Sequence, residues 1–279
     1  MRYPQLRQKF NTYLQLLPSV QDHYGFVQSD ECDSLIFTGL TGSVAGAHIK
    51  DITAAYDSYK DQWHRRPLEW PCYMGGYSSS TISRDQLLGL AWYCWRNKRL
   101  DIAEKIVRRA LRCVGKMGEG NLNPIMMSPG LFATYCWICY KLGGSNYWWA
   151  RWFPADMGSK KLQGYQAHLQ VIHRLLRSEL TGKVTDKDKE IYTHHAKRQI
   201  LNPLFQYLAG NVDKAVELLL HKVWWPEGRL PTKADRAEPW LIQRDFAAHD
   251  WEPAKNRLDK IHCGGDFLFI ADLILNRSK

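Results

Sequence analysis

Residues 86–95 read Gln-Leu-Leu-Gly-Leu-Ala-Trp-Tyr-Cys-Trp, and they decide the fold class because almost no polar face remains around such a helix. A helix that is apolar all round must be enclosed by other elements. The following stretch carries its apolar residues, from Ile102 to Val114, on one stripe and its charged residues opposite. That pattern is typical of a half-solvated outer helix. Together the two stretches predict a helical hairpin with an inner and an outer arm.

The alternation of enclosed and amphipathic helices recurs along the chain. Residues 131–142 and 266–275 are apolar all round, whereas residues 162–180 carry their aliphatic side chains on a single face. A first inner helix is expected to run from Leu35 toward Tyr59. Shorter helices are expected over residues 187–201, 203–209 and 212–223, the second of them beginning at an Asn202-Pro203 cap.

These helices predict an all-α fold, an (α/α) toroid of about five to six helical hairpins, with residues 1–279 as a single domain. No stretch reads as a convincing strand. Stacked helical repeats would also alternate, but they tend to keep a fixed period. Here the connections are unequal, and several are long and aromatic. Long loops in a compact domain are more often functional than accidental.

Composition and cysteine usage describe a globular chain with reduced thiols. Hydrophobic residues make up 45% and charged residues 24%, which argues against disorder. The longest apolar run, 132–140, is too short to span a bilayer, and the first residues lack an apolar signal core. A cytoplasmic location, or one not reached through a cleaved signal peptide, is therefore expected. Seven cysteines, an odd number, predict buried thiols, and neither a metal nor a cofactor is expected.

The formal net charge of +10 suggests an anionic partner, such as an acidic polysaccharide, a nucleic acid or a membrane surface. A general solubility charge is the alternative explanation. Lysine and arginine are spread over many helices, and no long basic tract or RNA-binding signature occurs. Nucleic acid is therefore the weaker option, and no membrane partner is expected.

Three aspartates each begin an enclosed helix: Asp33, Asp85 and Asp266. In a ring of inner helices that run the same way, these helix starts would meet at one rim. Hydrolysis of a glycosidic bond needs two carboxyl groups, one to protonate the leaving oxygen and one to activate water or attack the sugar. Acidic residues are also favoured in a first helical turn, and Ser83 with Gln86 fits a capping box, so a structural role is the alternative.

The loop that follows the first inner helix is rich in aromatic and charged residues. Exposed aromatic rings stack on sugars, and arginines bind carboxylate or sulfate groups, although tryptophans also fill helix interfaces. The candidate substrate-binding residues of this loop are Trp63, His64, Arg65, Arg66, Glu69, Trp70, Tyr73 and Tyr77.

A second mixed cluster precedes the last enclosed helix. Glu238 and Asp245 are alternative acid–base candidates there, and Trp240 and Arg244 are further substrate-binding candidates. A salt bridge between Arg244 and Asp245 that only closes the fold is the structural alternative.

The segment Ser83-Arg-Asp-Gln-Leu-Leu-Gly89, which follows a Trp-rich loop and an Asp-Ser-Leu-Ile-Phe helix start, resembles the six-hairpin glycosidase superfamily. The resemblance covers residues from about 30 to 118 in local detail, with about five hairpins where six are usual. It implies a helical toroid with an open cleft at the rim of inner-helix N-termini. The acidic catalysts would then fall on Asp33 and Asp85.

The leading hypothesis is a glycoside hydrolase that acts on a polymeric carbohydrate, and the positive net charge is compatible with an acidic polymer. Asp33 and Asp85 would be its acid and base, with Asp266 as the reserve candidate. A polysaccharide lyase is the alternative enzyme; it would use Tyr73 or Tyr77 with His64, and Arg65 or Arg66 to neutralise a uronate. A non-catalytic helical module that binds a glycan or a protein is the third possibility.

Overall fold

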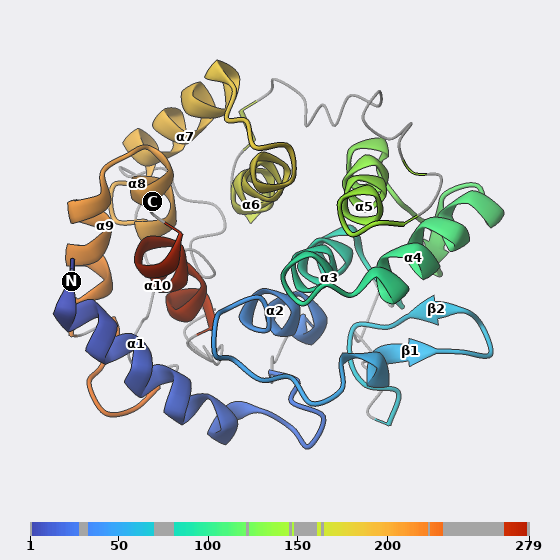
Figure 1. The fold of residues 1–279 in the computed structure, drawn as a ribbon, viewed down its shortest axis with the longest axis horizontal. Helices are drawn as coiled ribbons and strands as arrows, with labels where there is room; N and C mark the ends of the chain where they lie inside the picture. Colours follow the sequence, from blue (N-terminus) through green and yellow to red (C-terminus); the bar gives the residue numbers. More distant parts are fainter. Residues whose placement is uncertain are drawn as a thin grey trace. The chain divides into compact units, whose positions relative to one another are not determined.

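The fold is predominantly helical in the part of the chain that the computed structural model describes, which comprises residues 2–27, 33–69, 81–120, 123–144, 147, 161–162, 165–222, 224–230 and 265–277. The contacts divide the chain into two compact units (Figure 1). Unit 1 contains residues 1–20, 44–47 and 158–279, and unit 2 contains residues 21–43 and 48–157. The prediction of an all-α fold is confirmed, while closure of the hairpins into a toroid stays a prediction. None of the described helices is both long and apolar enough to cross a bilayer.

Unit 2 is built from helices and two small β-hairpins. Its elements are α2 (Ser34–Thr41), the 3-10 helix η2 (Ile52–Ala55), β1 (Tyr56–Asp57), β2 (Gln62–Trp63), α3 (Arg84–Arg96), α4 (Leu100–Arg112), β3 (Lys116–Gly118), β4 (Ile125–Met126) and α5 (Pro129–Lys141). Strand β1 pairs antiparallel with β2, and β3 pairs antiparallel with β4. The expectation of a helix running from Leu35 toward Tyr59 is wrong. Helix α2 ends at Thr41, and Gly46 then adopts a φ of 87°, which a right-handed helix cannot accommodate.

Helices α2 and α3 lie side by side in unit 2 (Figure 1). They touch through glycines: a Cβ atom added at Gly39 would collide with the backbone of Gly89, and one added at Gly89 would lie 2.5 Å from the Cα of Ile36. Further along, the Asn97 side chain donates a hydrogen bond to the Gly42 carbonyl at 2.8 Å. Contacts that advance along both helices together require a parallel pair.

Helix α3 is enclosed, as its sequence predicts, and α5 is mostly buried, although Tyr140 near its C-terminal end is 37% exposed. Residues 86–94 of α3 are all buried, and the Tyr135 hydroxyl of α5 donates a hydrogen bond to the Leu87 carbonyl at 2.6 Å. Helix α4 buries its predicted stripe only as far as Ala110. Leu111 and Val114 are 58% and 85% exposed, because the helix ends at Arg112 and Val114 turns to a φ of 50°.

Three of the four described thiols of unit 2 agree with the prediction of buried cysteines. Cys94, Cys136 and Cys139 are free and buried, whereas Cys113 is free and half-buried. Burial raises the pKa of Cys136 to about 12, so this thiol is protonated at neutral pH. No group of three His, Cys, Asp or Glu side chains within the described ranges could hold a metal ion.

The described part of unit 1 is helical. Its described elements are α1 (Pro4–Leu16), the 3-10 helix η1 (Leu17–Val20), α6 (Tyr165–Thr181), α7 (Asp186–Arg198), α8 (Pro203–Leu208), α9 (Val212–Leu219) and α10 (Gly265–Asn276). Helix α10 is enclosed as predicted, with residues 266–274 buried, and it packs against α1, α8 and α9. The Asn202 cap is also confirmed, since its side chain accepts a hydrogen bond from the Phe205 amide at 3.2 Å.

Helix α6 differs from its prediction as an outer amphipathic helix. Its aliphatic face is buried, but the polar face is buried as well. The polar side chains find partners: Arg174 contacts Asp188 of α7 at 2.5 Å, and His168 hydrogen-bonds to Asn202 at 2.7 Å. Hydrogen bonds and ion pairs offset the desolvation cost of burying polar groups. The sequence pattern reports only polarity, so it cannot distinguish a solvated polar face from a paired one.

His195 of α7 also lies in the core. Its ring is 3% exposed and lies 3.3 Å from the Gln170 amide oxygen. His168 and His195 both stack near the ring of Phe205, at centroid distances of 4.8 and 5.2 Å. Two histidines of α6 and α7 thus belong to the core of unit 1.

Replacement of Gly89 by alanine should strongly destabilise the protein, because the added methyl would meet the Ile36 backbone and force α2 and α3 apart. We expect a loss of about 3 kcal/mol or more, at the upper end of overpacking costs, in urea-induced unfolding. The control is Gly182→Asn, at a left-handed position where no atom lies within 4 Å of an added Cβ. Equal losses in the two variants would contradict the close approach.

Mild acid should destabilise the protein through its buried histidines. Burial, the main cause, lowers the pKa of His195 from 6.5 to about 4 and that of His173 from 6.5 to about 3. Below pH 6.5 these two histidines therefore bind protons in the unfolded chain but stay neutral in the folded chain until the pH approaches their lowered pKa values. The free energy of unfolding should fall by up to about 1.4 kcal/mol per pH unit for each histidine as the pH drops from 6.5 toward 4.

The measurement is urea-induced unfolding at several pH values. His195→Gln should make the free energy of unfolding depend less steeply on pH. The control His221→Gln, at an exposed position of unit 1, should leave this pH dependence unchanged. An unchanged slope in His195→Gln would show that this ring does not stay neutral in the folded protein.

Candidate functional site

Asp33 precedes the first turn of α2, where its carboxylate contacts two neighbouring segments instead of capping its own helix. Oδ1 accepts a hydrogen bond from Nη1 of Arg65 at 3.1 Å and another from Nε2 of Gln86 at 2.9 Å. The side chains of Asp33 and Arg65 are only 12% and 11% exposed. Asp33 is thus part of a shielded ion pair at the N-terminal end of α2.

The first amides of α2 are also satisfied from outside the helix. The Leu35 amide donates to the Arg65 carbonyl at 2.9 Å, and the Ile36 amide donates to Oε1 of Gln86 at 2.9 Å. These amides would otherwise lack partners, as at any helix N-terminus. Arg65 and Gln86 therefore cap α2 and bind Asp33 at the same time.

The expectation that Gln86 forms a capping box with Ser83 is wrong. Ser83 occupies the N-cap position of α3 without capping through its side chain, and its hydroxyl instead donates a hydrogen bond to Oδ1 of Asp85. Gln86 is fully buried and reaches across to α2. The physical reason is the contact between Gly39 and Gly89, which brings α2 close to α3. At this separation the Ile36 amide and the Asp33 carboxylate both lie within hydrogen-bonding reach of the Gln86 side chain.

Asp85 lies in the first turn of α3, next to the residue that binds Asp33. Its side chain is half-buried, and no ion pair involves it among the described residues. Asp33 and Asp85 thus lie at the same end of two neighbouring parallel helices. Their settings differ, because Arg65 lies 3.1 Å from Asp33, whereas Asp85 accepts a hydrogen bond from the Ser83 hydroxyl.

Trp63 does not suit the predicted role of a sugar-stacking platform. Its ring is 3% exposed and packs against Tyr56 across the β1–β2 hairpin, with ring centroids 5.3 Å apart. This prediction is wrong for Trp63, because the short hairpin, which the sequence did not reveal, folds the ring into the core.

The other described residues of the aromatic loop have separate partners. His64 is half-buried beside Gln62 and Asp57, at 3.3 and 3.9 Å, and burial lowers its pKa. Glu69 accepts a hydrogen bond from the Tyr24 hydroxyl at 3.1 Å and lies 3.2 Å from His23. Arg66 is half-buried. Among the described candidates of this loop, Arg65 is therefore the one whose side chain donates a hydrogen bond to Asp33.

Several candidates cannot be compared with this site. Asp266 belongs to unit 1, where it is buried in the first turn of α10 and accepts a hydrogen bond from the Phe267 amide at 2.9 Å. Its convergence with Asp33 stays a prediction. The candidates that lie outside the described residues are Trp70, Tyr73, Tyr77, Glu238, Trp240, Arg244 and Asp245.

A further carboxylate near the start of α3 escaped the sequence analysis. The Arg65 amide donates to the Thr81 carbonyl at 3.1 Å, and the Thr81 amide donates to the Glu119 carbonyl at 2.9 Å. Glu119 follows β3, and its side chain is 61% exposed and paired with Lys116 at 2.6 Å. Only recognition of β3 as a strand could have placed residue 119 beside residue 81.

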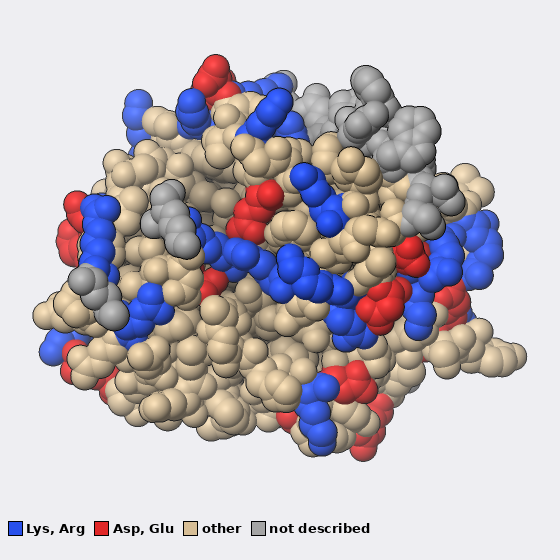
Figure 2. All heavy atoms as spheres, in the orientation of Figure 1, with Lys and Arg blue, Asp and Glu red and all other residues tan. Residues whose placement is uncertain are grey.

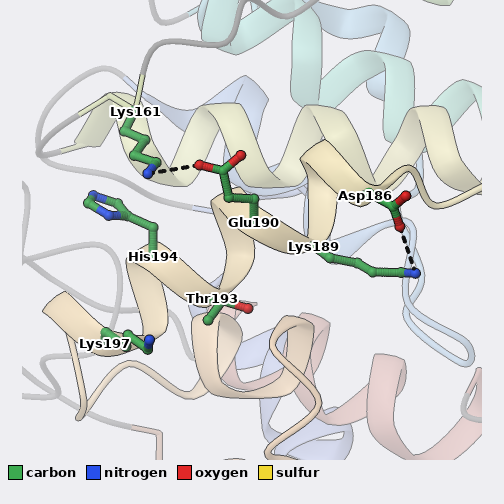
Figure 3. A pocket seen from close by; sticks show the side chains of 7 residues that line it. All are labelled: Lys161, Asp186, Lys189, Glu190, Thr193, His194 and Lys197. Atoms are coloured by element: carbon green, nitrogen blue, oxygen red, sulfur yellow. Dashed lines mark hydrogen bonds and ion pairs between the residues drawn. The ribbon is translucent and has the colours of Figure 1, made fainter.

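Unit 1 carries a separate hollow of about 490 Å³ along α7 (Figure 3). Its charged groups largely pair with one another: Lys161 binds Glu190 at 2.9 Å, and Lys189 binds Asp186 at 3.1 Å. The four side chains are 39–99% exposed. None of the predicted site residues lines this hollow, which has the character of a solvated helix face.

The surface charge is mixed on the face drawn in Figure 2. Lysine and arginine side chains cross this face, and acidic side chains lie among them. The net charge of +10 therefore accompanies a mixed surface on this face and does not by itself identify a partner.

The chain matches no protein-family model, no curated protein and no solved structure. The resemblance to the six-hairpin glycosidase superfamily thus stays a prediction, and the function must be argued from the residues themselves.

Removal of one partner from the Asp33–Arg65 pair should be costly, because the other charge would remain in a shielded place. Arg65→Ala is expected to lower the free energy of unfolding by roughly 3–5 kcal/mol. A double-mutant cycle with Asp33→Ala should give a coupling energy above about 1.5 kcal/mol in urea unfolding.

The matched control is the pair Arg99–Asp101, which is 2.7 Å apart but has side chains that are 33% and 57% exposed. Its coupling energy should stay below about 1 kcal/mol. Similar couplings for the two pairs would mean that Asp33 is not shielded.

Proposed function

We propose that the protein is a glycoside hydrolase that acts on a polymeric carbohydrate at the N-terminal end of α2 and α3. The observation that carries this proposal is the pair Asp33 and Asp85, which lie at the same end of parallel neighbouring helices in different electrostatic settings. Catalytic acid and base are typically two carboxyl groups whose environments separate their proton affinities. In this proposal the pair would provide the two carboxyl groups that glycosidic cleavage needs.

The settings of the two aspartates suggest their roles. Asp33, beside Arg65, would stay ionised and either take a proton from the attacking water or attack the anomeric carbon itself. Asp85, which has no basic partner among the described residues, would donate its proton to the glycosidic oxygen as the bond to the anomeric carbon breaks. Water supplies the atoms that complete the two products.

Acidic and neutral polymers are both candidate substrates, because the net charge of +10 allows an acidic polymer without identifying one. A lyase is less well supported, because Arg65 already binds Asp33 and would have to leave it to neutralise a uronate. His64, the other described residue of the lyase hypothesis, is engaged with Gln62 and Asp57.

Asp85→Asn should abolish most of the turnover while binding and folding survive. The wild-type protein is incubated with neutral and acidic polysaccharides, and new reducing ends are measured. Because general acid catalysis contributes typically 10²–10⁴-fold, the variant should lose at least about 100-fold in kcat. The matched control is Asp101→Asn, an aspartate in the first turn of the outer helix α4, which should keep full activity.

Other outcomes would exclude the hydrolase. An unsaturated product that absorbs in the ultraviolet would indicate a lyase, since hydrolysis creates no double bond. Binding of a polysaccharide without any product, unchanged in Asp33→Asn and Asp85→Asn, would indicate a non-catalytic module. Full activity of Asp85→Asn on a cleaved polymer would remove Asp85 as the proton donor.

A further inference from the structure

The amide of Gln86 joins the two helices that carry the candidate carboxylates. Its Nε2 donates to Oδ1 of Asp33 at 2.9 Å, and its Oε1 accepts from the Ile36 amide at 2.9 Å. The side chain is fully buried. Since an amide N–H can only donate and an ionised carboxylate can only accept, the two partners determine which way the Gln86 amide points.

The position of Gln86 follows from the contact between α2 and α3. Gly89, one helical turn further along α3, lies against the backbone of Ile36. Gln86 therefore faces α2 just beyond the closest approach, where the first amides of α2 and the Asp33 carboxylate come within reach of a glutamine side chain. The same turn of α3 carries Asp85.

Substitutions at this position would separate the two hydrogen bonds. A glutamate could still accept from the Ile36 amide, but it would bring a second carboxylate against Asp33. A methionine would fill a similar space without donating or accepting strongly. Arg65 supports Asp33 from the other side at 3.1 Å, so the carboxylate would keep one donor in either variant.

We propose that Gln86 is a positioning residue, which keeps Asp33 ionised and fixed relative to Asp85 by tying its carboxylate to α3. This inference rests on the proposed function for its catalytic meaning, but its physical content concerns only Gln86 and Asp33. A purely structural role, in which Gln86 merely caps α2, would leave the titration of Asp33 unchanged.

The test is an NMR titration of the full chain labelled with ¹³C at the aspartate carboxyl carbons, with the Asp33 signal assigned by its loss in Asp33→Asn. In Gln86→Glu the midpoint of Asp33 should rise by at least about one pH unit, because two adjacent carboxylates cannot both ionise freely. Gln86→Met should raise it by less, since only one donor is lost. The control Gln62→Met, at another buried glutamine of unit 2, should leave it unchanged.

A midpoint of Asp33 that stays the same in folded Gln86→Met would overturn the proposal, because this variant removes the donor without adding a charge. If the variants do not fold, the wild-type protein still tests it: the Gln86 side-chain amide signals should shift with the midpoint of Asp33, and this shift should vanish in Asp33→Asn. If the Gln86 side-chain amide signals do not shift as Asp33 titrates, the proposal is also overturned.

Activity separates this inference from the proposed function. If the wild-type protein cleaves a polysaccharide, the acidic limb of its kcat/KM profile should move upward in Gln86→Glu together with the NMR midpoint of Asp33. If no polysaccharide is cleaved, the proposed function fails, whereas the NMR titration still decides whether Gln86 controls Asp33.

Discussion

The close approach of α2 and α3 is the constraint on which the candidate site depends. Gly39 and Gly89 remove the side chains that would hold the two backbones apart, so α2 packs directly on α3. At this distance a glutamine of one helix can reach both an amide and a carboxylate of the other. A helix of only eight residues, such as α2, gains its stability mainly from such contacts, because short helices are marginal on their own.

In each unit a buried aspartate is held by an arginine from a neighbouring segment. Asp33 is held by Arg65 in unit 2, and Asp188 is held by Arg174 in unit 1, where Thr185 adds further hydrogen bonds. A buried ion pair contributes little net stability but becomes costly when one partner is lost. Such pairs therefore specify how helices meet, and at the start of α2 the pair places an arginine 3.1 Å from the Asp33 carboxylate.

Apolar periodicity predicted the enclosed helices well, because a helix without a polar face has only one stable environment. Helices α3 and α10 are buried over nearly their whole predicted length, and α5 is mostly buried as far as Cys139. The pattern failed for α6, whose polar face is covered by α7 and α8, and for Leu35 to Tyr59, where a short helix gives way to a hairpin. It failed because polarity along the chain does not reveal whether a polar group will meet water or a partner far away in sequence.

The sequence by itself determined the helical class, the enclosed segments, the buried thiols and the occurrence of acidic residues at helix starts, since all of these depend on local patterns. Only the tertiary structure decided that Gln86 serves α2 and not its own helix, that Arg65 pairs with Asp33, and that Trp63 is core. Each of these depends on residues separated by tens of positions along the chain, and their meeting is decided by how closely two backbones can pack.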